Sequence, residues 1–335
     1  MKTPPALPVA QETPVFAIGR VLRALEKIAS NRRPIVVGPW TGEVGFELLY
    51  WIPFVRWARA QFDLAPEREL VISRGGVASW YSVEADHYAD VFSVLSADEF
   101  RAATADKTTL KQRYEGDLDR RIIDAVTRQR GIAEKVNVLH PGMMYRTFSQ
   151  YWDDDAGYAR IGAFTKYAPL RPPADGRPSG LPPDYVAVRF YFSRSFPDTP
   201  ENRAFAQMVV AALAERGPVV LLTSGLRVDD HADWIPAAGR GVTVADVSDL
   251  ERNLAIQSAI IGGARAFVGT YGGYSYLAPL YGVPAIAFYV QRGFDPEHLY
   301  AATRAFARVG AAPLTVIDVT QSTLVQSALG MLMTS

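Results

Sequence analysis

The chain has 335 residues, of which 49% are hydrophobic, so it is long enough for two domains of about 150 residues, each with its own core. Its 35 Lys and Arg residues balance 35 Asp and Glu residues, which argues against a nucleic-acid-binding protein with its usual basic excess. The absence of cysteine excludes disulfide bonds and thiolate metal sites.

The first half of the sequence predicts buried strands that alternate with helices. Residues 1–13 are proline-rich and are expected to form a disordered tail. Helices are predicted at 15–30, at 46–62 with an interruption at Pro53, and at 107–130, and strands at 34–38, 69–73, 90–95 and 135–140. We assign residues 14–167 to an N-terminal Rossmann-like domain.

The second half begins after a segment that cannot form regular structure. Residues 168–183 contain six prolines and are interpreted as an interdomain linker. Residues 184–335 form the predicted C-terminal domain, in which Thr199-Pro200 has the capping pattern of a helix start. Its strands are predicted at 185–191, 219–223, 242–246, 266–269, 285–289 and 314–318. The predicted fold class is α/β, with two Rossmann-like, doubly wound domains facing a cleft.

A glycine turn after the 266–269 strand is the strongest functional signal. Small residues and hydroxyls there meet the start of a helix, where unpaired N–H groups and the helix dipole suit a phosphate. The expected donor-binding residues of this turn are Thr270, Gly272, Gly273 and Ser275, with Tyr271 or Tyr276 packing on a sugar or ribose. The alternative is an ordinary strand–helix turn whose glycines serve close packing.

Other strand ends in the C-terminal domain supply further donor-binding candidates. Arg189 and Arg194 are expected to neutralise a diphosphate, because guanidinium groups bind phosphate with two hydrogen bonds; a surface salt bridge is the alternative. Thr223 and Ser224 would lie beside the nucleotide, and Asp246 would accept ribose hydroxyls. The alternative is a turn for Thr223 and Ser224 and a helix cap for Asp246.

In the N-terminal domain, two carboxylates lie in and after the glycine turn that follows residues 34–38. Glu43 and Glu47 are the catalytic candidates, because transfer with inversion needs a base for the acceptor hydroxyl. For both residues the alternative is a structural role at the start of the helix, either in stabilising the helix dipole or in a capping box. Arg74, Trp80 and Tyr81, after the 69–73 strand, are expected to form an acceptor platform on which a sugar stacks, although the aromatic rings would also suit a core.

The two-domain layout and the phosphate turn resemble a GT-B glycosyltransferase. The run from Ala245 to Gly269 is similar to the lipopolysaccharide heptosyltransferase family, with a strand and an Asp-Leu turn before the helix that leads to the donor loop. Where that family carries an Asp-Ser-Gly…His pattern, this chain has Tyr271-Gly-Gly-Tyr-Ser-Tyr276. The resemblance through Pro53 to Arg56 places Glu47 on the family's catalytic acidic position, whereas the loop placement favours Glu43.

These features predict a glycosyltransferase that moves a sugar from a nucleotide-sugar donor to a glycan or lipid-linked acceptor, with inversion and without a metal or other cofactor. A lipid-linked acceptor would bring with it a peripheral association with the membrane. The sequence has no apolar run of about 20 residues and no signal-peptide core, so we expect a cytoplasmic protein. The alternatives are a polysaccharide pyruvyltransferase and a non-catalytic nucleotide- or sugar-binding protein.

Overall fold

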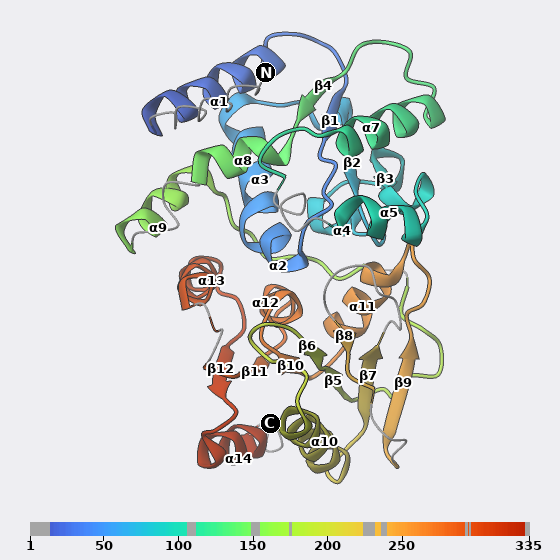
Figure 1. The fold of residues 1–335 in the computed structure, drawn as a ribbon, viewed down its shortest axis with the longest axis vertical. Helices are drawn as coiled ribbons and strands as arrows, with labels where there is room; N and C mark the ends of the chain where they lie inside the picture. The colour runs from blue at the N-terminus through green and yellow to red at the C-terminus, as the bar shows by residue number, and fades with distance from the viewer. Residues whose placement is uncertain are drawn as a thin grey trace, which may run out of the picture.

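The computed structural model describes residues 14–105, 112–148, 155–173, 176–223, 232–235, 240–291, 294 and 296–331. We call residues 14–164 the N-terminal half and residues 186–331 the C-terminal half. Each half contains a parallel sheet with helices on both faces, as Figure 1 shows. The predicted tail at residues 1–13 lies outside the described residues, and the predicted domain bounds stay a prediction.

The N-terminal half is built on four parallel strands. They lie in the order β3 (Tyr88–Asp90), β2 (Glu69–Ser73), β1 (Ile35–Val37) and β4 (Asn137–Leu139). Its helices are α1 (Pro14–Ala29), α2 (Val44–Phe46), α3 (Ile52–Phe62), α4 (Ala78–Tyr81), α5 (Ala97–Thr104), α7 (Asp117–Gln129), α8 (Pro141–Phe148) and α9 (Asp155–Ile161). A π-helical turn, η1 (Glu47–Trp51), joins α2 to α3, and short 3₁₀ turns lie at Pro66–Arg68, Ala85–His87, Val91–Ser93 and Gly162–Phe164.

The C-terminal half is built on six parallel strands. They lie in the order β12 (Leu314–Asp318), β11 (Ala285–Tyr289), β10 (Ala266–Thr270), β5 (Val186–Arg189), β7 (Val219–Thr223) and β9 (Val242–Asp246). A small antiparallel ribbon pairs β6 (Tyr191–Phe192) with β8 (Ala232–Asp233). The helices are α10 (Pro200–Ala214), α11 (Asn253–Gly262), α12 (Gly273–Leu280), α13 (Pro296–Val309) and α14 (Ser322–Met331).

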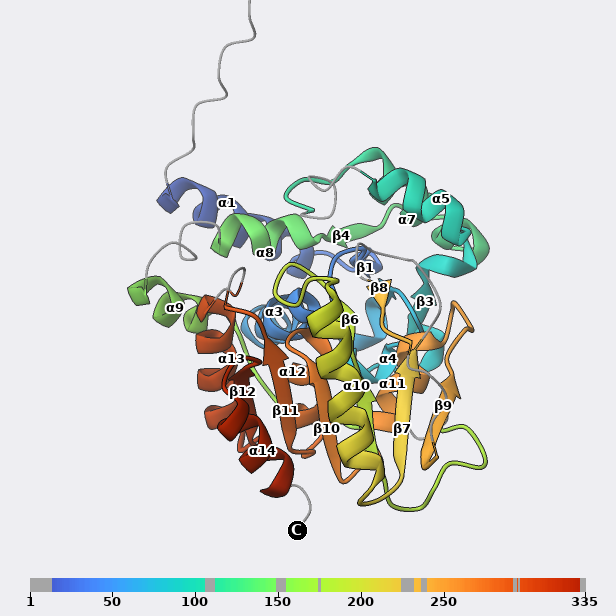
Figure 2. The same cartoon turned by 60° about the horizontal axis from the view of Figure 1, so that its bottom comes forward.

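In both sheets the first strand lies inside the sheet and later strands are added on each side of it. This is the doubly wound arrangement, so the predicted fold class is confirmed. From β1 the chain adds β2 and β3 on one side before β4 joins the other, and β5, β7 and β9 are followed in the same way by β10 to β12. Ile35, Val36 and Val37 are each 0% exposed, because helices cover both faces of a parallel sheet and its strands are continuously apolar. Figure 2 shows α10 and α14 in front of the larger sheet, where they share a core with Val186 and Val188.

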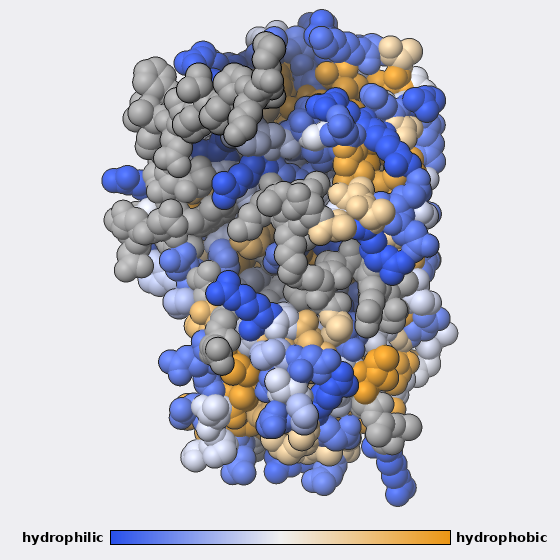
Figure 3. All heavy atoms as spheres, viewed as in Figure 1, coloured by the Kyte–Doolittle hydropathy of each residue, from blue (hydrophilic) through white to orange (hydrophobic). Residues whose placement is uncertain are grey.

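One apolar core joins the two halves. It contains Trp51 and Phe54 from the N-terminal half together with Leu277 and Ala302 from the C-terminal half. Helix α12 contacts α2 and η1, and α13 also contacts η1, so the carboxyl ends of the two sheets face each other through direct contacts. Where the face in Figure 3 is coloured, hydrophilic residues predominate and hydrophobic residues lie in separate groups.

Three sequence-based expectations are wrong in detail. The predicted strand at 90–95 gives way to a 3₁₀ turn, because the Asp90 side chain accepts a hydrogen bond from the Phe92 N–H at 2.9 Å. The helix at 46–62 is not interrupted at Pro53. In an α-helix the Leu49 carbonyl would accept from the N–H of residue 53, which proline lacks, and here it accepts from the hydroxyl of Tyr167 instead. In the predicted 107–130 helix, residues 107–111 lie outside the described residues, and α7 begins only at Asp117.

Candidate functional site

In each sheet the strand order reverses beside the first strand. These points lie between β1 and β4 and between β5 and β10, and open α/β sheets bind ligands at the carboxyl ends of such strands. The two places touch: a Cβ added to Gly273, at the start of α12, would lie 2.7 Å from Val44 Cγ1 and 2.8 Å from the Gly45 nitrogen. We call residues 38–47, after β1, the glutamate turn and residues 270–275, after β10, the glycine turn. Together they form one candidate site.

Side chains and backbone from elsewhere in the N-terminal half hold the backbone of the glutamate turn. The Gln112 side chain accepts from the Thr41 N–H at 3.0 Å and donates to the Pro39 carbonyl at 2.8 Å. Arg74 donates through Nη2 to the Gly42 carbonyl at 2.5 Å, and the Trp40 N–H donates to the Ile72 carbonyl at 2.9 Å. These bonds fix the path of the chain that leads to Glu43.

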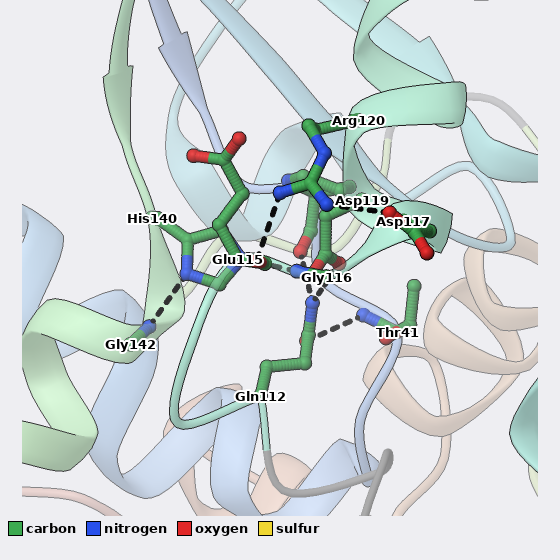
Figure 4. A network of polar contacts seen from close by, with 10 residues as sticks. Thr41, Gln112, Glu115, Gly116, Asp117, Asp119, Arg120, His140 and Gly142 are labelled. Atoms are coloured by element: carbon green, nitrogen blue, oxygen red, sulfur yellow. Dashed lines mark hydrogen bonds and ion pairs between the residues drawn. The ribbon is translucent and has the colours of Figure 1, made fainter.

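A buried network extends from Gln112 to the turn after β4, as Figure 4 shows. Gln112 also donates to Asp119 Oδ1 at 2.9 Å, and Asp119 Oδ2 accepts from the Gly116 N–H at 2.7 Å and lies 3.3 Å from His140 Nε2. Because His140 Nδ1 accepts from the Gly142 N–H at 2.9 Å, the neutral imidazole carries its proton on Nε2, toward Asp119. The network thus ties together the segments that follow β1 and β4.

Glu43 and Glu47 lie in very different environments. Glu43 is exposed at the N-cap of α2, its side chain makes no capping bond to α2 in the described part of the chain, and its carboxylate raises the pKa of the neighbouring Tyr145 beyond the effect of burial. Glu47 is 0% exposed, and its Oε1 accepts from the hydroxyls of Ser73 and Tyr81, each at 2.6 Å. The Oε2 atom of Glu47 has no hydrogen-bond partner among the described residues.

Burial raises the pKa of Glu47 to about 7, against the smaller lowering effects of Ser73, Tyr81 and the charge of Arg74. Asp90, whose pKa burial also raises to about 7, accepts from the Gly76 N–H at 2.8 Å. Such values suit groups that change protonation near neutrality. The exposed Glu43 can meet a substrate directly, whereas Glu47 lies in the interior beneath it.

The expected acceptor platform requires a correction. Trp80 and Tyr81 are both 0% exposed, so neither ring offers a face on which a sugar stacks. The Trp80 indole joins the two halves instead, because its Nε1 donates to the hydroxyls of Tyr281 at 2.9 Å and Ser258 at 3.1 Å. Arg74 is 5% exposed, and its Nε has no hydrogen-bond partner within the described residues. The interior reading of the two aromatic rings, left open by the sequence, is the one observed.

The hydroxyls of the glycine turn are also used within the structure. Thr270 Oγ1 donates to the Tyr191 carbonyl at 2.9 Å and accepts from the Tyr191 N–H at 3.0 Å. Ser275 Oγ bonds the carbonyl and the N–H of Gly272, at 2.7 and 3.1 Å. The hydroxyls of Tyr271 and Tyr276 lie 2.5 Å apart in the interior. The structure therefore corrects two expectations: that the hydroxyls of Thr270 and Ser275 face a ligand, and that the ring of Tyr271 or Tyr276 packs on a sugar or ribose.

The two glycines of this turn have a packing role. Gly272 has a φ of 153°, and a Cβ there would lie 1.9 Å from the Tyr191 hydroxyl. Gly273 lets α12 approach α2 closely. The packing role that the sequence left open is thus observed, and a role of their backbone in binding phosphate stays a prediction.

Arg189 is buried at the end of β5 and already has anionic and polar partners. Its Nη2 lies 2.8 Å from Asp233 Oδ1, its Nη1 donates to Gln257 Oε1, and its guanidinium carbon lies 4.1 Å from the centre of the Tyr274 ring. We expected Arg189 to bind a diphosphate or to form a surface salt bridge. The observed ion pair is buried, not superficial.

The remaining donor candidates come at or just after the ends of other strands, β6, β7 and β9, in the sequence. Arg194 is exposed between the bridged residues Ser193 and Phe196. The hydroxyl of Thr223, at the end of β7, is buried without a hydrogen-bond partner among the described residues, and Ser224 lies outside them. Asp246 accepts from the N–H and hydroxyl of Ser248, which lowers its pKa, so its side chain stabilises a turn and does not cap α11, whose N-cap is Arg252.

Sequence reasoning missed the partners that come from distant elements. Gln112, Asp119, Asp233 and Gln257 carry no local motif, and only the fold brings them to the two turns. The same holds for His298 in α13, whose Nδ1 lies 2.8 Å from the hydroxyl of Tyr50 in η1. A histidine placed one position after an acidic residue in a helix gives no sign of a partner 248 positions away.

A surface hollow lies away from the candidate site. It is lined by Gln207, Val210, Ala211, Ala214, Glu215, Arg240, Gly241 and Val242, where α10 ends and β9 begins. This is the amino-end side of the sheet, opposite the place where doubly wound folds bind ligands. In the described part of the chain, no three His, Asp or Glu side chains gather as a metal would require, and no helix has the length and apolar character to cross a membrane.

Comparisons with known proteins give similarity at the level of the fold. No family model matches the chain, and no curated protein matches it in sequence. Among solved structures, a glycosyl transferase of family 9 from Veillonella parvula aligns over 90% of this chain and 90% of its own, with 11% identity and a TM-score of 0.43.

Two E. coli structures align in the same way. The heptosyltransferase WaaC with ADP covers 89% of this chain and 99% of its own, with 12% identity and a TM-score of 0.47. The ADP-heptose LPS heptosyltransferase II covers 90% and 99%, with 13% identity and a TM-score of 0.45. At these identities and scores we draw the function of this chain from its own residues.

Proposed function

We propose that this chain is a glycosyltransferase that takes a sugar from a nucleotide-sugar donor and passes it to a hydroxyl of a glycan or lipid-linked acceptor. One observation supports this above all: the reversal points of the two doubly wound sheets meet, so that Gly273 lies against Gly45. Reaction between two bound molecules needs two sites held against each other, and holding reactants together removes much of the barrier.

The C-terminal half is the proposed donor side. The diphosphate would lie at the carboxyl ends of β5 and β10, where the first N–H groups of α12 and the helix dipole favour an anion. Since the hydroxyls of Thr270 and Ser275 serve the fold, backbone groups are the better candidates for this contact. The leaving group is then stabilised by the N-terminus of α12, beside the Arg189–Asp233 pair, without a metal or other cofactor.

The N-terminal half is the proposed acceptor side, with Glu43 as the base. Glu43 would take the proton of the acceptor hydroxyl while that oxygen forms a bond to the anomeric carbon, and the bond from this carbon to the diphosphate breaks on the opposite face. Transfer therefore proceeds with inversion. Glu47, fixed by Ser73 and Tyr81, keeps the helix behind Glu43 in place and does not meet the substrate.

A lipid-linked acceptor would place the enzyme at a membrane surface, and we propose that it works there from the cytoplasm. An exposed, charged Glu43 suits a polar acceptor hydroxyl of either kind, so the acceptor class is a question for experiment.

The test is a thermal-shift screen with UDP, GDP, ADP, CMP, dTDP and phosphoenolpyruvate, each with and without Mn²⁺. One nucleotide at 100 times its Kd is expected to raise Tm by about 5 °C, with or without Mn²⁺. A shift with phosphoenolpyruvate alone would favour pyruvyl transfer. Nucleotide binding without turnover of the matching nucleotide sugar would favour a binding protein, and no shift with any nucleotide would contradict the proposal.

A further inference from the structure

Arg189 is surrounded by four elements of the C-terminal half. It ends β5; β8 contributes Asp233, α11 contributes Gln257, and the first turn of α12 contributes Tyr274. Its Nη2 and Nε lie 2.8 and 3.3 Å from Asp233 Oδ1. The guanidinium therefore lies beside the helix start that faces the glutamate turn.

This ion pair is almost fully shielded from water. The side chains of Arg189 and Asp233 are 10% and 7% exposed. A guanidinium so placed keeps its charge, and its carboxylate partner balances that charge at short range. An anion that approaches α12 thus meets a neutral pair, although the arginine alone would attract it.

The charge of the ligand changes in the proposed reaction. In a nucleotide sugar, both phosphates are diesters or anhydrides with one negative charge each. Once the sugar has left, the terminal phosphate keeps only its anhydride bond and gains a second ionisable oxygen. Like a phosphate monoester, it has a second pKa near 6, so it gains most of another charge at pH 7. A residue that tunes the positive charge at this point will act differently on donor and product.

We propose that Asp233 is a specificity-determining residue of the donor site: by neutralising Arg189 it weakens binding of the free nucleoside diphosphate more than binding of the nucleotide sugar. This inference rests on the proposed function, because it places the diphosphate beside Arg189. Asp233 would thereby favour release of the product, because its carboxylate repels the additional negative charge of the free diphosphate.

The test compares Asp233→Asn with the wild type by calorimetry. Inorganic pyrophosphate and the nucleoside diphosphate that stabilises the protein are the probes, together with the corresponding nucleotide sugar. Asn keeps an oxygen for Arg189 but removes the charge. We expect the Kd of pyrophosphate and nucleoside diphosphate to fall at least tenfold, and that of the nucleotide sugar about threefold or less. Unchanged or weaker binding of the first two, or an equal gain for all three, would overturn the inference.

Asp184→Asn is the matched control. Asp184 pairs with Arg265 at 3.2 Å, just before the amino ends of β5 and β10, so its loss also removes the partner of an arginine but not at the proposed site. It is expected to leave all three Kd values unchanged. An equal gain in this variant would show a general charge effect and overturn the specific one.

The double variant Arg189→Met/Asp233→Asn removes both charges. It provides a second test of the inference if the single variant does not fold. Because the intact pair brings no net charge, pyrophosphate affinity should stay within twofold of the wild type. A tenfold loss would show that Arg189 binds the anion despite Asp233 and would overturn the inference. If no nucleotide binds any variant while Asp233→Asn binds pyrophosphate tightly, the donor assignment fails and the charge-balancing role of Asp233 stands.

Discussion

The glutamate turn after β1 and the glycine turn after β10 touch each other but are stabilised in opposite ways. In the glutamate turn, remote side chains bind the backbone: Gln112 holds Pro39 and Thr41, and Arg74 holds Gly42. In the glycine turn, local hydroxyls bind the backbone, as when Ser275 bonds both polar groups of Gly272. The first turn thereby holds the exposed side chain of Glu43 on a fixed backbone, whereas the hydroxyls of the second turn already bond to the backbone.

This difference explains which chemistry each turn suits. An exposed carboxylate on a backbone fixed from outside can act as a base, because its position does not depend on bonds that the reaction breaks. The glycine turn, whose hydroxyls already bond to the backbone, lies at the positive end of the α12 dipole, which suits an anion. The predictions below test this division, beginning with the largest expected effect.

Replacing the exposed glutamate should remove chemistry and leave binding intact. Glu43→Gln is expected to lower kcat about 10²- to 10⁴-fold, the usual contribution of a general base, with little change in the Kd of the nucleotide. Rates of sugar transfer and calorimetric Kd values check this. Glu47→Gln, measured beside it, should keep most of the activity; the reverse ranking would make the buried glutamate the base.

Removing the remote support of the glutamate turn should destabilise the protein. Gln112→Met leaves the Pro39 carbonyl, the Thr41 N–H and Asp119 Oδ1 without their buried partner, and unpaired buried groups cost about 1–3 kcal/mol each. Urea unfolding should show a loss of about 4 kcal/mol. The control is Gln129→Met on the exposed end of α7, expected to change stability by less than about 0.5 kcal/mol. Equal effects of the two changes would contradict the anchoring role.

The buried Glu47 should make stability depend on pH. Because its folded pKa is about 7 and its ordinary value 4.5, its stabilising contribution is complete below pH 4.5 and is lost as pH rises through 7. The shift corresponds to about 3 kcal/mol. Glu47→Gln cannot ionise, so between pH 5 and pH 8 its unfolding free energy should fall less than that of the wild type. Parallel pH curves would show that Glu47 does not titrate in this range.

The positions of several strands follow from patterns visible in the sequence. Runs such as Val219–Thr223 and Ala285–Tyr289 are apolar along their whole length, which is typical of strands covered on both faces, and both have the predicted bounds. The strand expected at 90–95 failed because the side chain of Asp90 binds the backbone two residues ahead, a contact that competes with pairing.

The site was harder to predict than the fold, for a physical reason. Sequence position locates Thr270 and Glu47 at the right strand ends but does not show whether their polar atoms face a ligand or the protein. Thr270 is fully buried because β6 folds back over it, and Glu47 because η1 turns it toward Ser73. Pairings such as Arg189 with Asp233, 44 positions apart, arise only from the fold.

The contact between the two turns can be tested with one methyl group. Gly273→Ala places a Cβ 2.7 Å from Val44 Cγ1 and 2.8 Å from a backbone nitrogen that cannot move aside, so α12 and α2 must separate. Overpacking of this kind costs about 2 kcal/mol, measured by urea unfolding, and the separation should weaken transfer more than nucleotide binding. Gly330→Ala in α14 is the control, because its Cβ meets nothing within 4 Å and alanine favours a helix by about 0.5–1 kcal/mol. If Gly273→Ala proved as harmless, the two turns would not need their close approach, and the proposed arrangement of donor and acceptor would lose its structural basis.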